Sequence, residues 1–202
     1  MARRESACCG PGASCCGAPA DADQVARRLG YAEEDVQSVP GGADLGLDCF
    51  IAARRAKKVI GVDMTPEMLD RARAGAKEAG FSNVEFRLGE IEHLPVADAS
   101  ADIVISNCVI NLSPDKRSVF NEAYRVLRPG GRVVVSDIVL TRDLPVPVRQ
   151  SAEALVGCVA GALLKEEYLQ AIRDAGFIGL EVLQEQSFPL DGLSCGAAPG
   201  IN

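Results

Sequence analysis

Short apolar runs and segments of helical spacing alternate along the middle of the chain. Val59–Val62 is a run of mostly β-branched residues with Gly61 inside it, and the acid Asp63 follows at once. Thr65-Pro66-Glu67 then opens a segment whose apolar residues recur at helical spacing until Gly80. A threonine before a proline is typical of a helix start, and a glycine of a helix end. This stretch therefore predicts a strand, a turn that carries an acid, and a helix.

The same alternation continues towards the carboxyl end. Strands are predicted over 83–88, 101–106 and 132–138, helices over 115–127, 148–162 and 165–175, and an antiparallel edge strand over 178–183. Two shorter helices are predicted upstream, over 21–35 and 51–56. This order of strands and helices is that of an α/β fold with a sheet of the Rossmann kind.

Composition places the chain among globular proteins of a single domain. It has 202 residues and a net charge of −7, and the acidic balance argues against non-specific nucleic-acid binding. No apolar segment approaches the roughly 20 residues that span a bilayer, and the amino terminus lacks the apolar core of a signal peptide. We therefore expect a cytoplasmic protein with no nucleic-acid or membrane partner.

Cysteine is the unusual part of the composition. There are eight, and four of them form the pairs Cys8-Cys9 and Cys15-Cys16 in a segment rich in Gly, Ala and Pro. That segment has neither a helical nor a strand period, so residues 1–22 are predicted to be a mobile tail before a single domain over 23–202. The four thiols could bind a soft metal or metalloid, although their spacing is not that of a structural zinc site. The alternative is an unstructured, reactive tail.

Four stretches carry a resemblance to a known family. They are V-I-G-V-D-M-T from Val59, I-S-N-C-V-I-N-L-S-P-D-K from Ile105, V-L-R-P-G-G-R-V-V-V-S-D-I from Val126 and V-G-C-V-A-G-A-L-L-K-E-E-Y from Val156. The L-R-P-G-G turn is widespread among class I S-adenosylmethionine-dependent methyltransferases. The second and fourth stretches are more specific, and through them the chain resembles the arsenite methyltransferases from Cys8 to about residue 189.

The resemblance implies trivalent arsenic as the substrate and two cysteines as its catalytic ligands, Cys108 and Cys158. Trivalent arsenic is soft and prefers thiolates to oxygen or nitrogen ligands. Cys108 follows a strand at the edge where ligands of open α/β sheets bind, and Cys158 belongs to a helical segment, 148–176, expected to fold over that edge. Because the arsenic lone pair would attack the methyl group directly, no general base is needed.

The resemblance also implies the methyl donor S-adenosylmethionine and the residues that hold it. Asp63 would bind the donor's ribose, as an acid after the second strand does in nucleotide-binding folds. The adenine and the methionine moiety would lie against Met64, Gly89, Glu90, Ile91 and Asn107. Cys49 would lie near the donor without binding arsenic. A thiol reductant, thioredoxin or glutathione, would recycle the cysteines, and a monomer is expected.

One segment of the family pattern is missing between Gly46 and Asp48. The family carries there its first strand, a Gly-rich turn that approaches the donor and a further arsenic-binding cysteine, roughly 20–30 residues judged from the size of a βαβ unit. We therefore predict a Rossmann-like S-adenosylmethionine-dependent methyltransferase sheet that lacks its first strand. The neighbouring strands must then pair across a gap or expose unpaired edges.

Three functions remain open from the sequence. The first is an arsenite methyltransferase. The second is a non-catalytic, thiol-rich remnant of that family that binds arsenite or a soft metal. The third is a methyltransferase for a small organic molecule, which leaves Cys108 and Cys158 unexplained.

Overall fold

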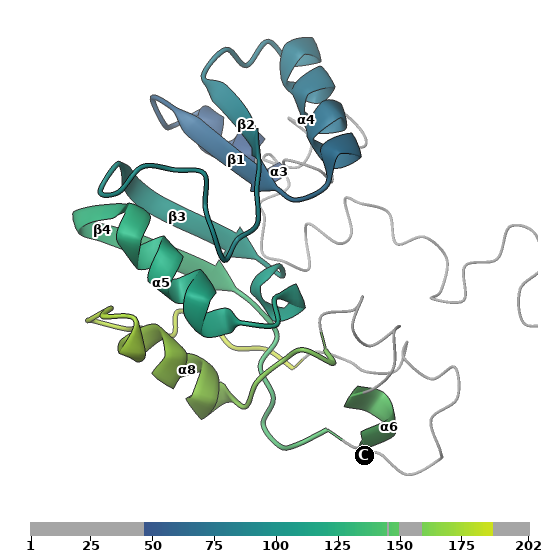
Figure 1. Cartoon of the computed structure of the whole chain (residues 1–202), viewed down its shortest axis with the longest axis vertical. Coiled ribbons are helices and arrows are strands. Elements are labelled where there is room, and N and C mark those ends of the chain that lie inside the picture. The colour runs from purple at the N-terminus through teal and green to yellow at the C-terminus, as the bar shows by residue number, and fades with distance from the viewer. Residues whose placement is uncertain (1–46, 145, 150–158, 188–202) are drawn as a thin grey trace, which may run out of the picture.

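The computed structural model describes residues 47–144, 146–149 and 159–187, which form helices and parallel strands in alternation (Figure 1). In chain order the elements are α3 (Leu47–Ala53), β1 (Val59–Asp63), α4 (Pro66–Glu78), β2 (Val84–Leu88), β3 (Ala101–Asn107), the 3-10 turn η1 (Ile110–Leu112), α5 (Lys116–Val126), β4 (Leu127–Ser136), α6 (Val146–Arg149) and α8 (Lys165–Asp174). The predicted α/β fold class is confirmed.

The first two strands form a parallel pair covered by α3 and α4. Val59 pairs with Val84 at one end of the ladder, and Asp63 pairs with Leu88 at the other. Phe50 of α3 is only 1% exposed and stacks on Phe81 with ring centroids 5.4 Å apart. Aromatic packing between α3 and the chain around β2 therefore holds this half together.

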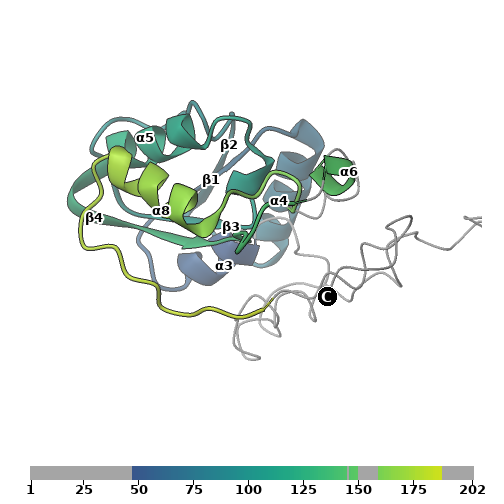
Figure 2. The same ribbon diagram turned by 90° about the horizontal axis from the view of Figure 1, so that it is seen from below.

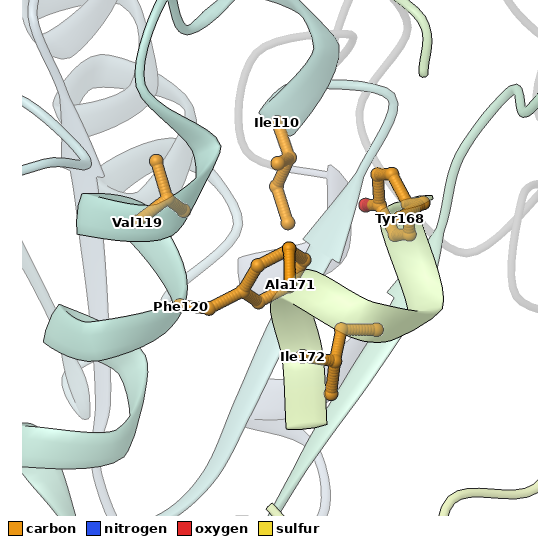
Figure 3. Packing of buried hydrophobic residues seen from close by; sticks show 6 residues of the cluster. All are labelled: Ile110, Val119, Phe120, Tyr168, Ala171 and Ile172. Atoms are coloured by element: carbon orange, nitrogen blue, oxygen red, sulfur yellow. The ribbon is translucent and has the colours of Figure 1, made fainter. Parts of the chain in front are cut away.

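The other two strands form a second parallel pair, with a register shift between Ala101 and Ile103. Figure 2 shows α5 and α8 on one side of the strands and α3 on the other. The core under α5 and α8 is one cluster of buried side chains (Figure 3): Ile110, Val119, Phe120, Tyr168, Ala171 and Ile172. The rings of Phe120 and Tyr168 meet edge to face at 5.4 Å, so this contact joins the two helices.

The two pairs are not joined into one sheet. Within the described residues β1 is hydrogen-bonded only to β2, and β3 only to β4. In Figure 1 the β1·β2 pair lies above the β3·β4 pair. Of the two predicted outcomes, residues 47–144 show edges of β1 and β3 without a partner strand among the described residues, and no pairing across the gap between them.

A long connection, residues 89–100, links the two pairs and is fastened to α5. The Arg125 guanidinium donates to the carbonyl oxygens of Leu94 and Val96 at 3.0 and 2.9 Å, and it pairs with Asp98. Glu122 Oε2 accepts from the Leu94 N–H at 2.8 Å. Hydrogen bonds to Arg125 and the Leu94 N–H lower the pKa of the Glu122 carboxyl. This connection ties the end of β2 to the half that contains α5.

Two predicted elements have other bounds: the helix predicted over 51–56 is α3 (Leu47–Ala53), and the strand predicted over 132–138 is part of β4 (Leu127–Ser136), which includes the predicted turn at 128–131. Two further predictions are wrong. Residues 178–183 are not a strand: Gly179 has a φ of +67°, and Ile178 and Leu183 are 95% and 80% exposed. Alternating polarity is not enough when no neighbouring strand pairs with the segment. The helix predicted to end at Ala162 does not reach it, because residues 159–162 form a turn in which Ala162 N–H donates to the Val159 carbonyl.

Several predictions fall on parts of the chain outside the described residues. They include the tail over 1–22 with Cys8, Cys9, Cys15 and Cys16, the helix over 21–35, and residues 150–158 with Cys158. Among the elements that the structure describes, no helix is long and apolar enough to cross a membrane.

Candidate functional site

Two of the predicted donor residues, Asp63 and Gly89, meet at the carboxyl end of the β1·β2 pair. Asp63 is the last residue of β1, and one of its carboxylate oxygens accepts from the Thr65 N–H at 2.7 Å. Its backbone carbonyl accepts from the Gly89 N–H at 3.0 Å. The turn after β1 and the turn after β2 are thus hydrogen-bonded to each other. Asp63 and Gly89 therefore lie side by side, as a ribose and adenine site requires.

Close packing explains why position 89 is a glycine. A Cβ placed on Gly89 would lie 2.7 Å from Cδ of Pro95, a distance that real Cβ atoms do not adopt. The next residue, Glu90, forms an isolated antiparallel bridge with His93. Met64 is 70% exposed, whereas Ile91 packs against the core cluster under α5 and α8. The structure therefore brings Met64, Gly89 and Glu90 to one edge and points the chain at Ile91 towards the second strand pair.

The predicted arsenic ligand Cys108 lies at the carboxyl end of β3, directly after Asn107. Its φ is +54°, a left-handed conformation that is uncommon for a residue with a side chain. Its N–H donates to the Ser136 carbonyl at 2.8 Å, so the end of β4 holds the turn in place. Such outliers gather at active sites, where the surrounding structure compensates for the strain. The half-buried Cys108 is thus presented at the edge where substrates of open α/β sheets bind.

A group of buried polar side chains lies beyond this turn, and the sequence patterns did not identify it. The Tyr168 hydroxyl donates to Asp137 Oδ2 at 2.9 Å, and the Asn111 side-chain amide donates to the Ile138 carbonyl at 2.7 Å. Asn111 and Tyr168 are 0% and 4% exposed. The signal that could have found Asp137 is the S-D-I at the end of β4, which repeats the strand-then-acid pattern of Asp63.

Burial dominates the electrostatics of this group. Desolvation raises the pKa of the Asp137 carboxyl to about 6, although the hydrogen bond from Tyr168 and the positive charge of Lys116 act in the opposite direction. Burial and then the negative charge of Asp137 raise the pKa of the Tyr168 hydroxyl, and a charge on Cys108 adds to this effect. The Cys108 thiol and this buried pair therefore share one electrostatic environment.

Cys49 has a different setting. It lies in α3 against the middle of β1, where a Cβ on Gly61 would come within 2.9 Å of its sulfur. Burial, and then the charge of Asp48, raise the pKa of the Cys49 thiol to about 11. A thiol of that pKa is protonated at neutral pH, which agrees with the prediction that Cys49 is not an arsenic ligand. The described ranges contain no group of three or more His, Cys, Asp or Glu side chains that could hold a metal ion.

The fold and this edge define a class of protein. Residues 42–176 match the methyltransferase domain family, and the chain therefore belongs to it, within the class I S-adenosylmethionine-dependent methyltransferases of Rossmann-like fold. The chain is 45% identical to the arsenite methyltransferase of Halobacterium salinarum over 197 residues, which include 83% of this chain and 50% of that protein. It is 38% identical to the human arsenite methyltransferase over 148 residues, 67% of this chain and 40% of that one.

A solved structure is also similar to this chain in fold and sequence. The arsenic (III) S-adenosylmethionine methyltransferase from Chlamydomonas reinhardtii superposes with a TM-score of 0.60 at 38% identity, covering 79% of this chain and 62% of that one. The chain spans about half the length of the curated relatives it matches.

Proposed function

We propose that this protein acts as an arsenite methyltransferase, which binds trivalent arsenic through Cys108 and Cys158 and transfers to it a methyl group from S-adenosylmethionine. The observation that carries the proposal is the strained turn at Cys108, where φ is +54° and the thiol is presented beside Asn107 at the carboxyl edge. The identities with arsenite methyltransferases, 45% and 38%, support arsenic as the substrate.

In this proposal the β1·β2 half holds the adenosine end of the donor, and the end of β3 holds arsenic and borders the donor's methionine end. Asp63 would hold the donor's ribose, Met64 and the turn Gly89–Ile91 its adenine, and Asn107 would shape the wall beside the methionine moiety. Support for the adenosine end comes from the hydrogen bond between the two turns, in which the Gly89 N–H donates to the Asp63 carbonyl at 3.0 Å. The donor supplies the methyl group when it is bound. The Cys108 thiolate would orient arsenic so that its lone pair faces that group.

The reaction also sets requirements outside the site. Thiolate ligands must stay reduced, so we propose that thioredoxin or glutathione serves as reductant in a cytoplasmic setting, and that the protein works as a monomer. The pairs Cys8-Cys9 and Cys15-Cys16 would give arsenic additional thiol ligands before it reaches the edge.

Calorimetric titration of the reduced protein with S-adenosylmethionine, with and without arsenite, tests the proposal. We expect micromolar donor binding that responds to arsenite, and Cys108→Ser should remove that response. Cys49→Ser is the matched control, because Cys49 is a protonated thiol packed behind β1. Arsenite binding without any donor signal would contradict the enzyme and leave the arsenite-binding remnant. Product formed by Cys108→Ser would exclude arsenic as the substrate.

A further inference from the structure

We propose that Asp137 and Tyr168 are positioning residues for the reaction. They hold residues 136–140, at the end of β4 and directly after it, and these residues in turn hold the Cys108 turn in its strained, arsenic-binding conformation. The inference rests on the proposed function of Cys108 and adds two residues to it. Neither side chain is needed as a ligand of arsenic or of the donor.

Residues 136–140, at the end of β4 and directly after it, are hydrogen-bonded both to the turn at Cys108 and to α8. Ser136 accepts from the Cys108 N–H at 2.8 Å, and the Ile138 carbonyl accepts from the Asn111 side chain at 2.7 Å. The turn that begins at Cys108 is therefore hydrogen-bonded to residues 136–140 on both sides of Asp137. Any displacement of these residues moves Cys108 with them.

Helix α8 is attached to the same residues. Leu140 N–H donates to the Leu163 carbonyl at 2.8 Å, and its own carbonyl accepts from the Lys165 N–H at 2.9 Å. The Tyr168 hydroxyl, one turn into α8, donates to Asp137 at 2.9 Å. This is the side-chain hydrogen bond that joins α8 to the middle of residues 136–140. It lies between the two points at which the Cys108 turn is held.

The burial of this pair argues for a specific role. Asp137 Oδ1 is inaccessible and accepts no hydrogen bond from the described residues, and Tyr168 is 4% exposed. Buried carboxylates are costly, and an apolar pair of similar volume packs under a helix at least as well. A half-buried acid with one inaccessible carboxylate oxygen is therefore better explained by a role in fixing the local geometry than by stability alone. The left-handed Cys108 is the strained residue nearby that needs such support.

The test measures the affinity of phenylarsine oxide, a trivalent arsenical that binds thiolates, for variants of the full chain. To remove competing thiols, the background carries serine at five positions outside the described residues: Cys8, Cys9, Cys15, Cys16 and Cys195. In this background Tyr168→Phe removes one hydroxyl and keeps the ring that packs on Phe120. Tyr124→Phe makes the same chemical change at a ring that is 52% exposed, and serves as the matched control.

We expect Tyr168→Phe to bind the arsenical roughly three- to tenfold more weakly, the range that one hydrogen bond supports. Tyr124→Phe should bind as the background does. Asp137→Asn keeps an acceptor oxygen for Tyr168 and should stay within about twofold of the background, whereas Asp137→Ala should match Tyr168→Phe. Rescue by asparagine is a result that simple loss of packing would not produce.

A second measurement separates positioning from loosening of the whole fold. The rate of alkylation of Cys49, followed by peptide mapping, reports on opening of the other strand pair, because that half-buried thiol in α3 packs against Gly61 of β1. It should be the same in all four variants. Unchanged arsenical affinity in Tyr168→Phe, or a loss matched by faster alkylation of Cys49, would overturn the inference. If Cys108→Ser also binds the arsenical normally, the proposed function itself is wrong.

Discussion

At the scale of single residues, the carboxyl edge holds two acids at equivalent positions with different surroundings. Asp63 and Asp137 each follow or end a strand, and each lies next to a turn that was predicted to bind a reactant. Asp63 accepts from a backbone N–H in an exposed turn, whereas Asp137 accepts from a buried hydroxyl. The same pattern in the sequence thus leads to an acid in an exposed turn in one place and to an acid paired with a buried hydroxyl in the other.

Asp137 makes stability depend on pH. Its pKa is about 6 in the folded protein against an ordinary value near 3.8, so between these values the folded state binds more protons than the unfolded one. The free energy of unfolding must therefore fall as the pH rises from about 4 to 6, by about 1–2 kcal/mol after allowance for partial exposure to solvent.

The variant Asp137→Asn should remove that part of the pH dependence, because an amide does not titrate. Urea unfolding at pH 4.5 and pH 7 measures it, with Asp63→Asn as the control acid at the other strand pair. An equal decline in the wild type and in Asp137→Asn would show that other groups cause the dependence.

At the scale of elements, two glycines in the β1·β2 half have opposite reasons for being there. A Cβ on Gly61 in β1 would lie 2.7 Å from the Phe86 ring and 2.9 Å from the Cys49 sulfur. A Cβ on Gly75 in the middle of α4 would lie 3.4 Å from Phe50, which is ordinary contact. The first glycine is required by packing of α3 against the strands, and the second is not.

Gly61→Ala should therefore lower the free energy of unfolding by about 1–3 kcal/mol, the usual effect of overpacking. Gly75→Ala should raise it by roughly 0.5–1 kcal/mol, since alanine is the better helix former. Urea unfolding of both variants, with the wild type alongside, checks the pair. A loss of stability in Gly75→Ala as large as that in Gly61→Ala would contradict this account of α3 packing.

At the scale of the whole molecule, the two strand pairs have edges without a partner strand in the described residues. Amides in a strand point alternately to either side. The Val59 N–H donates to the Asn83 carbonyl next to β2, so the N–H groups of Ile60 and Val62 point to the other edge of β1. The Cys108 N–H donates to the Ser136 carbonyl of β4, so the N–H groups of Ile103 and Ile105 point to the other edge of β3.

Amide hydrogen exchange followed by NMR should show this alternation directly. Ile60, Val62, Ile103 and Ile105 should exchange much faster than Gly61 and Val104, their neighbours in the same strands. Uniform protection along β1 and β3 would mean that another strand pairs with them.

The missing segment leads to a further prediction for the whole molecule. Insertion, between Gly46 and Asp48, of a strand and a Gly-rich turn of the kind expected at the start of such a sheet should add backbone contacts to the donor. Affinity for S-adenosylmethionine, measured by calorimetry, should rise by at least about tenfold, which corresponds to one or two added hydrogen bonds. A scrambled insert of the same length is the control. An unchanged affinity would show that the present chain already closes its donor site.

The sequence by itself determined the local elements and the chemistry of the edge. Apolar runs such as Val59–Val62 and the segment of helical spacing after Thr65 specify their structure through nearby residues, so β1, α4, α5 and α8 were predictable. The positions of Asp63 and Cys108 followed as well, because parallel strands end at one edge.

Only the tertiary structure decided what depends on contacts between distant segments. Whether 178–183 pairs as a strand, and whether β1 and β3 meet, depends on partners that no local pattern contains. The link between Asp137 and Tyr168 joins residues 31 positions apart, and the strain at Cys108 becomes visible only in its backbone angles. Local sequence sets the preferences of each segment, but packing between segments settles which edges stay open and which polar groups are buried.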